Sequence, residues 1–291
     1  MIATLTSTEK TPPTMEKVLR RIDEISTLPQ VALKVLEVAN DPDSGAADLK
    51  AVLESDAALS ARLLRCVNSS AYAVRTRITN LQQAIAYLGL KQVRNLAMTA
   101  SVSELFKKDE KIGSYCRRDL WRHLVSVGLC ARLIALRRKI RNFEDAFLAG
   151  LLHDVGIVLE DQHVHPEFVQ IMRALDETKI LTDNERAVLG FDHTTLGEKI
   201  AESWGFPDAV RAAIRYHHAS VNYRGEDIDI VRCVEVGNLI CTLKGITSVG
   251  ARLVRASQPA LQGLSLGKDD IIVLAEDLDH ELTQNATLFS L

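Results

Sequence analysis

The segment FLAGLLHDVG, residues 147–156, decides how this chain is interpreted. Its apolar and small residues lead directly into His153 and Asp154, and a carboxylate that is buried without a partner is costly. We therefore expect a strongly apolar helix over residues 143–159 that carries this polar pair into an otherwise apolar region. Imidazole and carboxylate groups are the ligands that intermediate divalent ions favour, so the pair is a candidate for metal binding.

Other histidines stand where they could join this pair. Asp119 and His123 are four residues apart, so on a helix they project from one face about one turn apart. His193 is expected at the start of a helix, and His217 shares the apolar stripe of the next one, with His218 rotated from it by about 100°. An alternative is a metal-free pocket in which these groups hydrogen-bond to one another. The pattern predicts a metal site formed by Asp119, His123, His153, Asp154, His193, His217 and His218.

The spacing of apolar residues predicts the fold class. They recur every three to four positions along nearly the whole chain, whereas strand-like alternation is rare. We expect an almost entirely helical protein, and an apolar content of 47% is ample to bury a core. Asp56 and either Thr79 or Asn80 are expected to cap helices, and Gly89 to end one. Residues 1–14 are polar and rich in Thr and Pro, which indicates a flexible tail.

The composition of the chain argues against several classes of protein. A net charge of −3 gives no reason to expect a nucleic-acid surface. Five dispersed cysteines without a CxxC motif indicate reduced thiols and a cytoplasmic protein. No signal core or membrane-spanning stretch is expected. The remaining length holds no recognisable receiver, kinase, cyclase or DNA-binding segment, so we expect a stand-alone output module whose input comes from another protein.

The order of these motifs resembles the HD superfamily, whose metal-dependent phosphohydrolases include the HD-GYP cyclic di-GMP phosphodiesterases. This resemblance is carried by His153-Asp154-Val155-Gly156, His193-x-x-x-Gly197, Trp204-x-x-Pro207 and His217-His218. The upstream half closely resembles the HDOD domain, an HD-related output domain of bacterial signalling proteins. Its motifs are Leu28-Pro29-Gln30, Asp41-Pro42, Asp56-x-x-Leu59, Leu63-Leu64-x-x-x-Asn68-Ser69 and Ala84-Ile85-x-x-Leu88-Gly89, and the resemblance extends over residues 15–220.

The resemblance implies an all-helical fold in two lobes. We expect an HDOD domain over residues 15–225, with an amino-terminal lobe at 15–112 and an HD-like lobe at 113–225. Helices within residues 226–291 are expected to pack on the HD-like lobe. The histidines named above and Asp154 match metal-binding positions of the superfamily, and Asp119 stands where HD-GYP enzymes have a ligand glutamate. The implied cofactor is Fe, Mn or Zn, with room for two ions.

Three departures from the superfamily count against catalysis. Ile157 replaces the lysine that often follows the His-Asp pair, and residues 219–225 lack the Gly-Tyr-Pro motif. Asn238 stands where the last aspartate ligand is expected, within one helical turn. Hydrolysis of a phosphoester needs metals that acidify water and carboxylates that orient them, so these changes weaken catalysis more than metal binding.

Two functions follow from this pattern. The first is a regulatory module of bacterial signal transduction that recognises signalling proteins and keeps a metal site without turnover. The second is a metal-dependent phosphohydrolase acting on a nucleotide or cyclic dinucleotide, with His153 and Asp154 as its catalytic centre. The first makes the protein a binding module and the second an enzyme, and we favour the first. A bound nucleotide is compatible with both, and the sequence indicates no oligomeric state.

Overall fold

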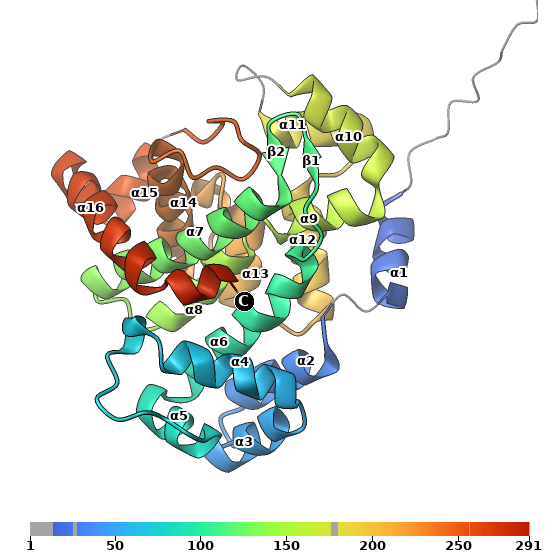
Figure 1. The fold of residues 1–291 in the computed structure, drawn as a ribbon. Coiled ribbons are helices and arrows are strands. Elements are labelled where there is room, and N and C mark those ends of the chain that lie inside the picture. The colour runs from blue at the N-terminus through green and yellow to red at the C-terminus, as the bar shows by residue number, and fades with distance from the viewer. Residues whose placement is uncertain (1–13, 26–27, 176–179, 256, 291) are drawn as a thin grey trace, which may run out of the picture.

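Figure 1 presents the computed structural model of the chain, in which residues 14–25, 28–175, 180–255 and 257–290 are described. Regular structure in these residues is almost entirely helical, apart from a short antiparallel hairpin of β1 (Lys111–Ile112) and β2 (Tyr115–Cys116). The all-helical, two-lobed prediction is confirmed. The predicted tail lies, except for Thr14, outside the described residues. None of the helices described is both long and apolar enough to cross a bilayer.

The amino-terminal lobe is a small bundle in which α2 and α4 both pack on α6. Local signals behave as expected, since the side chains of Asp56 and Asn80 accept backbone N–H groups at the starts of their helices. Gly89, with φ of 82°, separates two of the helices. The elements are α2 (Gln30–Asn40), α3 (Ala46–Glu54), α4 (Ala57–Val67), η1 (Ser70–Tyr72), α5 (Leu81–Leu88), α6 (Leu90–Val102) and η2 (Ser103–Phe106).

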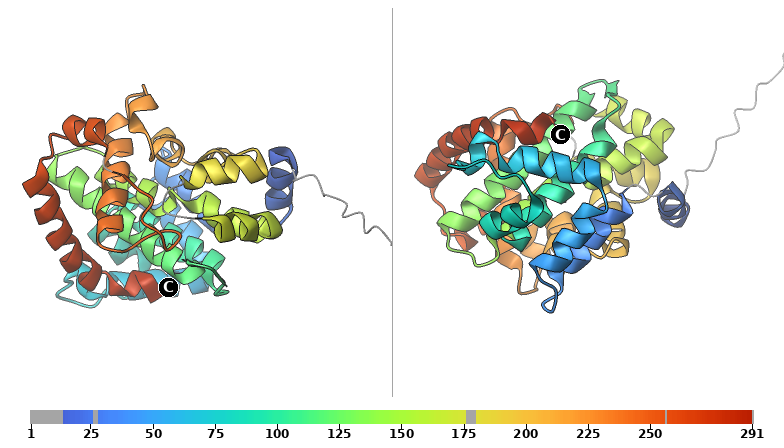
Figure 2. Two further views of the ribbon diagram at one scale, coloured as in Figure 1. Left: turned by 90° about the horizontal axis from the view of Figure 1, so that it is seen from above. Right: turned by 60° about the horizontal axis from the view of Figure 1, so that its bottom comes forward.

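The carboxy-terminal lobe is built around the long helix α7, which packs against both α8 and α14. α16 also lies against α7 and runs along the outer edge of the molecule (Figure 2, left). The elements of this lobe and the segment that follows are α7 (Arg117–Arg137), α8 (Phe143–Leu152), α9 (Val155–His163), α10 (His165–Ala174), α11 (Leu181–Leu189), α12 (His193–Ser203), α13 (Asp208–Tyr216), η3 (Ser220–Asn222), α14 (Ile228–Leu243), α15 (Gln258–Gly263), α16 (Lys268–Gln284) and η4 (Ala286–Ser290).

Two glycines allow α7 and α8 to touch through their backbones. A Cβ atom on Gly150 of α8 would lie 2.7 Å from Cα of Gly128 on α7, closer than packed atoms can approach. The crossing therefore requires glycine. It places the middle of α7 directly beside α8, and so brings His123 toward His153 at the end of α8.

The first helix lies away from its sequence neighbours. α1 (Met15–Ile25) packs against α9 and α12 (Figure 1). The segment expected to open the amino-terminal lobe thus contacts the carboxy-terminal lobe, because its buried side chains Val18 and Ile22 need an apolar surface. The division of the chain at residues 112 and 225 stays a prediction.

A buried ion pair joins the two lobes. Arg94 of α6 is fully buried, and its Nη2 donates to Asp145 Oδ1 of α8 at 2.8 Å. Its Nη1 donates to Oδ1 of Asn40 at 2.9 Å. Lys91 Nζ lies 2.9 Å from the other oxygen of Asp145, but its side chain is 45% exposed. The two cations should therefore differ in their contribution to stability, because only the arginine is removed from water.

Replacing Arg94 tests this junction. Arg94→Met is expected to lower the free energy of unfolding by about 3 kcal/mol, because Asp145 and Asn40 would be left without their buried partner. Lys91→Met, the matched control on the same carboxylate, should cost less than about 1 kcal/mol. Urea unfolding followed by circular dichroism measures both values. Equal losses in the two variants would contradict the assignment.

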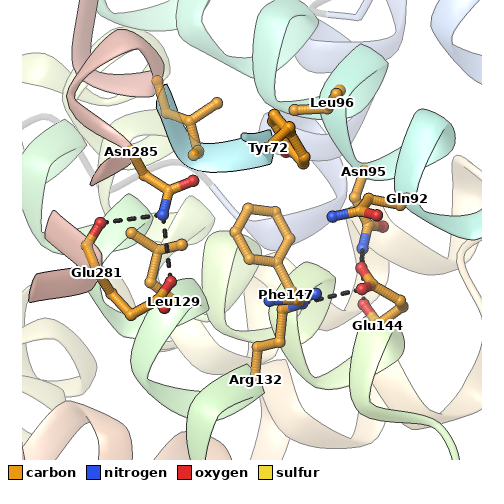
Figure 3. Close-up of a pocket in the computed structure, with 12 residues that line it drawn as sticks. Tyr72, Gln92, Asn95, Leu96, Leu129, Arg132, Glu144, Phe147, Glu281 and Asn285 are labelled. Atoms are coloured by element: carbon orange, nitrogen blue, oxygen red, sulfur yellow. Dashed lines mark hydrogen bonds and ion pairs between the residues drawn. The ribbon is translucent and has the colours of Figure 1, made fainter. Parts of the chain in front are cut away.

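The carboxy-terminal segment closes a second junction between the lobes. There α6, α7, α8, α16 and η4 surround a pocket of about 120 Å³ (Figure 3). Its polar groups pair with one another: Glu144 accepts from Arg132 Nε at 2.9 Å and from Asn95 Nδ2 at 2.8 Å. Asn285 Nδ2 donates to Glu281. The bonds of Glu144 thus join α6, α7 and α8 on one side of the pocket, and α16 and η4 line the other side.

Candidate metal centre

His153 and Asp154 occupy a break between two helices. The helix expected over residues 143–159 is in fact interrupted, since α8 ends at Leu152 and α9 begins at Val155. The two helices have different neighbours: α8 crosses α7 at Gly150, while a Cβ on Gly156 of α9 would lie 2.0 Å from the carbonyl oxygen of His193. The chain must therefore turn between them, and this turn aims both polar side chains at one place.

Five imidazole rings converge on Asp154. Its Oδ2 lies 3.2 Å from His153 Nε2 and 3.7 Å from His123 Nε2. Its Oδ1 lies 3.1 Å from His217 Nε2 and 3.3 Å from His193 Nε2. His218, which is otherwise exposed, points its Nε2 inward, 3.1 Å from Nε2 of both of these rings. Two groups of ligand atoms therefore share one carboxylate.

Hydrogen bonds orient four of the five rings. The Nδ1 atoms of His123, His153 and His217 donate to the carbonyl oxygens of Ile246, Gly150 and Ile214, at 2.9, 2.7 and 2.9 Å. A carbonyl oxygen can only accept, so Nδ1 carries the proton and the lone pair of Nε2 faces the cluster. This arrangement, a ring anchored by one nitrogen and open at the other, is typical of metal ligands.

The fourth ring is anchored by a buried carboxylate. Nδ1 of His193 donates to Glu185, whose oxygens lie 2.7 and 2.9 Å away, and Glu185 also accepts the backbone N–H of His193 at 3.1 Å. Glu160 lies beside Glu185, and burial together with the charge of Glu185 raises the pKa of Glu160 well above its usual value. The protonated form of Glu160 is therefore favoured beside the carboxylate that anchors His193.

The charges of the cluster favour a bound cation. Burial alone would raise the pKa of Asp154, but the surrounding histidines hold it well below its usual value. Burial, reinforced by His153, lowers the pKa of His123 to about 4, and burial also lowers the pKa of His217. For His193, burial is outweighed by Glu185 and Asp154, which raise its pKa. The Asp154 carboxylate is thus ionised, and the neutral rings of His123 and His217 face it with free lone pairs, while a cation bound at His193 would take the place of a proton.

The spacing of these atoms fits a divalent ion. Bonds of about 2.1 Å at tetrahedral or octahedral angles separate neighbouring ligand atoms by about 3.0–3.4 Å, and most separations in the cluster are 3.1–3.3 Å. Oδ1 of Asp154 is buried and has no hydrogen-bond partner, which is costly unless a cation lies nearby. Both groups offer at least three ligand atoms: His123, His153 and Asp154 in one, and Asp154, His193, His217 and His218 in the other.

Two residues singled out in the sequence need separate treatment. Asp119 is exposed in the first turn of α7 and belongs to neither group of ligand atoms, so the structure does not bring it to the site. It lies one helical turn before His123, at the exposed start of the helix. Asn238 is buried in α14, and its Oδ1 has no hydrogen-bond partner.

A cavity of about 140 Å³ adjoins the second group. Glu235 and Thr242 of α14 line it, which places the face of α14 that carries Asn238 toward the site. Residues within 248–255 also line the cavity, and this segment is held by Ser114 Oγ, which donates to the carbonyl of Val249 at 2.8 Å. The lining combines polar and apolar side chains: Asp154, Leu181, His193, His217, His218, Glu235, Thr242, Val249, Leu253 and Arg255.

Sequence reasoning missed Glu185 and Glu235. Glu185 lies on α11, and Gly190 ends that helix before His193, so no single periodicity links the two residues. Glu235 precedes Asn238 by three residues on the same helix. Because the position of the last aspartate ligand is placed only within one helical turn of Asn238, a search of that turn for a carboxylate would have found Glu235. Its Oε2 accepts the backbone N–H of Ser220 at 3.1 Å.

Glu185 should position His193 for metal binding. Glu185→Gln keeps a hydrogen-bond acceptor but removes the charge, and is expected to weaken zinc affinity by about ten-fold or more. Competition with a chromogenic chelator measures the affinity. Glu202→Gln, an exposed change on α12, serves as the control and should leave it unchanged. The prediction fails if both variants bind zinc as tightly as the wild type does.

Comparisons with known proteins agree with this architecture. A family model of the HDOD domain matches residues 25–220. The chain belongs to the HDOD family. An HDOD domain protein of unknown function from Geobacter sulfurreducens is 26% identical, with a TM-score of 0.76 and coverage of 93% of this chain and 96% of that one. The family resemblance deduced from the motifs is confirmed.

Two further relatives extend the comparison. A structure from Marinobacter aquaeolei VT8, provisionally described as a signal transduction protein, is 26% identical with a TM-score of 0.73, and the match covers 90% of this HDOD chain and 58% of that chain. A protein from Treponema pallidum (strain Nichols), described as uncharacterized, is 25% identical over 201 residues. That match covers 68% of this chain but 38% of the relative's length, so the relative contains much that this chain does not match.

Proposed function

We propose that this HDOD protein is a regulatory module of bacterial signal transduction, located in the cytoplasm, whose HD-type site holds a divalent metal but has little or no phosphohydrolase turnover. The observation that carries the proposal is the convergence of five imidazoles on Asp154, four of them held with Nε2 inward. The signalling role is supported by the similarity to the Marinobacter protein.

The residues that would hold the metal are those of the two groups at Asp154. Iron, manganese or zinc suits imidazole and carboxylate donors. Such an ion, when bound, supplies Lewis acidity and charge stabilisation. The chain fixes the orientation of the ligand rings through the carbonyl oxygens of α8 and α13 and the Glu185 carboxylate. Asp154 provides negative charge between the two groups of ligand atoms.

The low turnover proposed here is attributed to two residues near the metal ligands, Ile157 and Asn238. Ile157 is fully buried and brings no positive charge toward a phosphate. Asn238 offers a neutral amide where a carboxylate ligand is expected, and an amide binds metal more weakly than a carboxylate. These substitutions leave the imidazoles in place, so they reduce reactivity more than metal affinity.

A metal-dependent phosphohydrolase is the second candidate, and one observation favours it. Glu235 and Arg255 both line the cavity beside the cluster. They could provide the carboxylate and the cation that Asn238 and Ile157 do not. A nucleotide or cyclic dinucleotide is the substrate class that this alternative requires, with Asp154 at the reactive centre.

Elemental analysis and a turnover assay separate the two candidates. We expect purified protein to contain metal and to leave a chromogenic phosphodiester intact when manganese is added. Turnover that disappears in Asp154→Ala would overturn the regulatory proposal and establish the enzyme. Absence of both metal and turnover, after incubation with iron, manganese or zinc, would overturn the metal site itself.

A further inference from the structure

The amino-terminal lobe has a strongly uneven charge distribution. Residues 15–56 contain nine acidic and five basic side chains, whereas residues 57–103 contain no aspartate or glutamate at all. This second stretch spans α4, α5 and α6. An uninterrupted excess of one charge on a lobe attracts partners of opposite charge. The basic residues of the stretch are Arg62, Arg65, Arg75, Lys91, Arg77 and Arg94.

Three of these six cations form ion pairs within the protein. Arg62 pairs with Glu104, and both Lys91 and Arg94 pair with Asp145. The other three, Arg65, Arg75 and Arg77, are exposed and form no ion pair or hydrogen bond with any residue that the structure describes. Three exposed guanidinium groups of this stretch are therefore available to a partner.

Two of these arginines line an open groove between α4 and the loop that leads to α5. The groove has a volume of about 710 Å³. Arg65 stands on α4 and Arg77 on the loop, and the side chains of Leu64, Val74 and Ile78 line the same groove and form its apolar floor. The loop forms the outer edge of the lobe, at the left of Figure 1. The site thus combines an apolar floor with two positive charges.

Asn68 holds the loop in shape. Its Nδ2 donates to the carbonyl oxygens of Leu64 and Ile78, at 2.7 and 2.9 Å, and its Oδ1 accepts the N–H of Ile78 at 2.9 Å. Tyr87 Oη also donates to the carbonyl of Tyr72 at 2.9 Å. One side chain therefore clamps α4 to the residue that follows Arg77, so the groove is preorganised, which reduces the entropy lost on binding.

We propose that this groove, lined by Leu64, Arg65, Val74, Arg77 and Ile78, binds an acidic segment of a partner protein that also carries apolar side chains. The proposal rests on the regulatory role proposed above and names the chemistry of the partner. Carboxylates pair bidentately with guanidinium groups, and the apolar side chains of the segment cover the floor.

A nucleic acid fits the groove less well. Proteins that bind single strands stack bases on aromatic side chains, and none of the residues that line the groove is aromatic. Three arginines are also few for a sequence-independent phosphate contact, and the chain has a net charge of −3. The apolar floor has no role in binding phosphates but is what an acidic peptide with apolar residues needs.

Fluorescence anisotropy with a labelled synthetic peptide of alternating glutamate and leucine tests the proposal. We expect binding to the full chain that weakens with salt, and no binding of the matching glutamine and leucine peptide. The double variant Arg65→Glu with Arg77→Glu should weaken binding by about ten-fold or more. Lys34→Glu with Lys50→Glu makes the same change in net charge on α2 and α3 and should have a much smaller effect.

Two further measurements keep the test decisive. Asn68→Ala leaves the charge unchanged and should weaken binding through loss of the loop geometry, with circular dichroism checking that the fold persists. The proposal is overturned if the acidic peptide does not bind, if both charge reversals weaken it equally, or if a single-stranded oligonucleotide of equal length binds more tightly. Metal content and turnover are measured separately, so failure of the metal site leaves this result intact, and the reverse also holds.

Discussion

Zinc or manganese at a hundred-fold excess over its dissociation constant is expected to stabilise the protein by about 2.7 kcal/mol, which corresponds to a rise of roughly 5 °C in Tm. The reason is that the native state gathers five rings around Asp154, while the unfolded chain does not. Thermal unfolding with and without a chelator measures the shift.

Asp154→Ala should remove this stabilisation completely. Asp154 is the member shared by both groups of ligand atoms, so its loss breaks each of them. Asp119→Ala is the matched control, because Asp119 was a predicted ligand but is exposed and lies in neither group. The control should keep the full metal-dependent shift. A shift that survives in Asp154→Ala, or one that vanishes in Asp119→Ala, would contradict the assignment.

Gly156→Ala is expected to cost about 3 kcal/mol of stability and to abolish metal binding. The added Cβ would lie 2.0 Å from the carbonyl oxygen and 2.7 Å from the carbonyl carbon of His193. Both are backbone atoms that no rotamer change can move. α9 and α12 would have to separate, and because Asp154 precedes α9 while His193 begins α12, their separation would pull the two ligands apart.

A buried glycine in α14 provides the control for this substitution. A Cβ on Gly237 would meet its nearest neighbour, the backbone nitrogen of Ala131, at 3.3 Å, and alanine favours a helix over glycine by about 1 kcal/mol. Gly237→Ala should therefore change stability little and retain metal. Chemical unfolding and elemental analysis compare the two variants. A Gly156→Ala protein with wild-type metal content would refute the role given to this close approach.

Local sequence signals predicted the helices of this chain well. The side chain of Asp56 caps α4, and that of Asn80 caps α5. His193 begins α12, as its position before an apolar stripe indicated. These features succeed because capping and amphipathic periodicity act over a few residues. The same reasoning failed at residues 143–159, where packing of α8 on α7 and of α9 on α12 breaks a helix that the apolar pattern alone favours.

The choice of candidate ligands also came from the sequence, through residue type and the order of motifs. The sequence by itself indicated most of the helices, and it named His123, His153, Asp154, His193, His217 and His218, because ligand chemistry belongs to the side chain. Only the tertiary structure decided that these six meet, that Asp119 is exposed and outside both ligand groups, and that Glu185 and Glu235 stand behind or beside the cluster. Those facts depend on how distant helices pack, and the close approaches at Gly128, Gly150 and Gly156 set that packing.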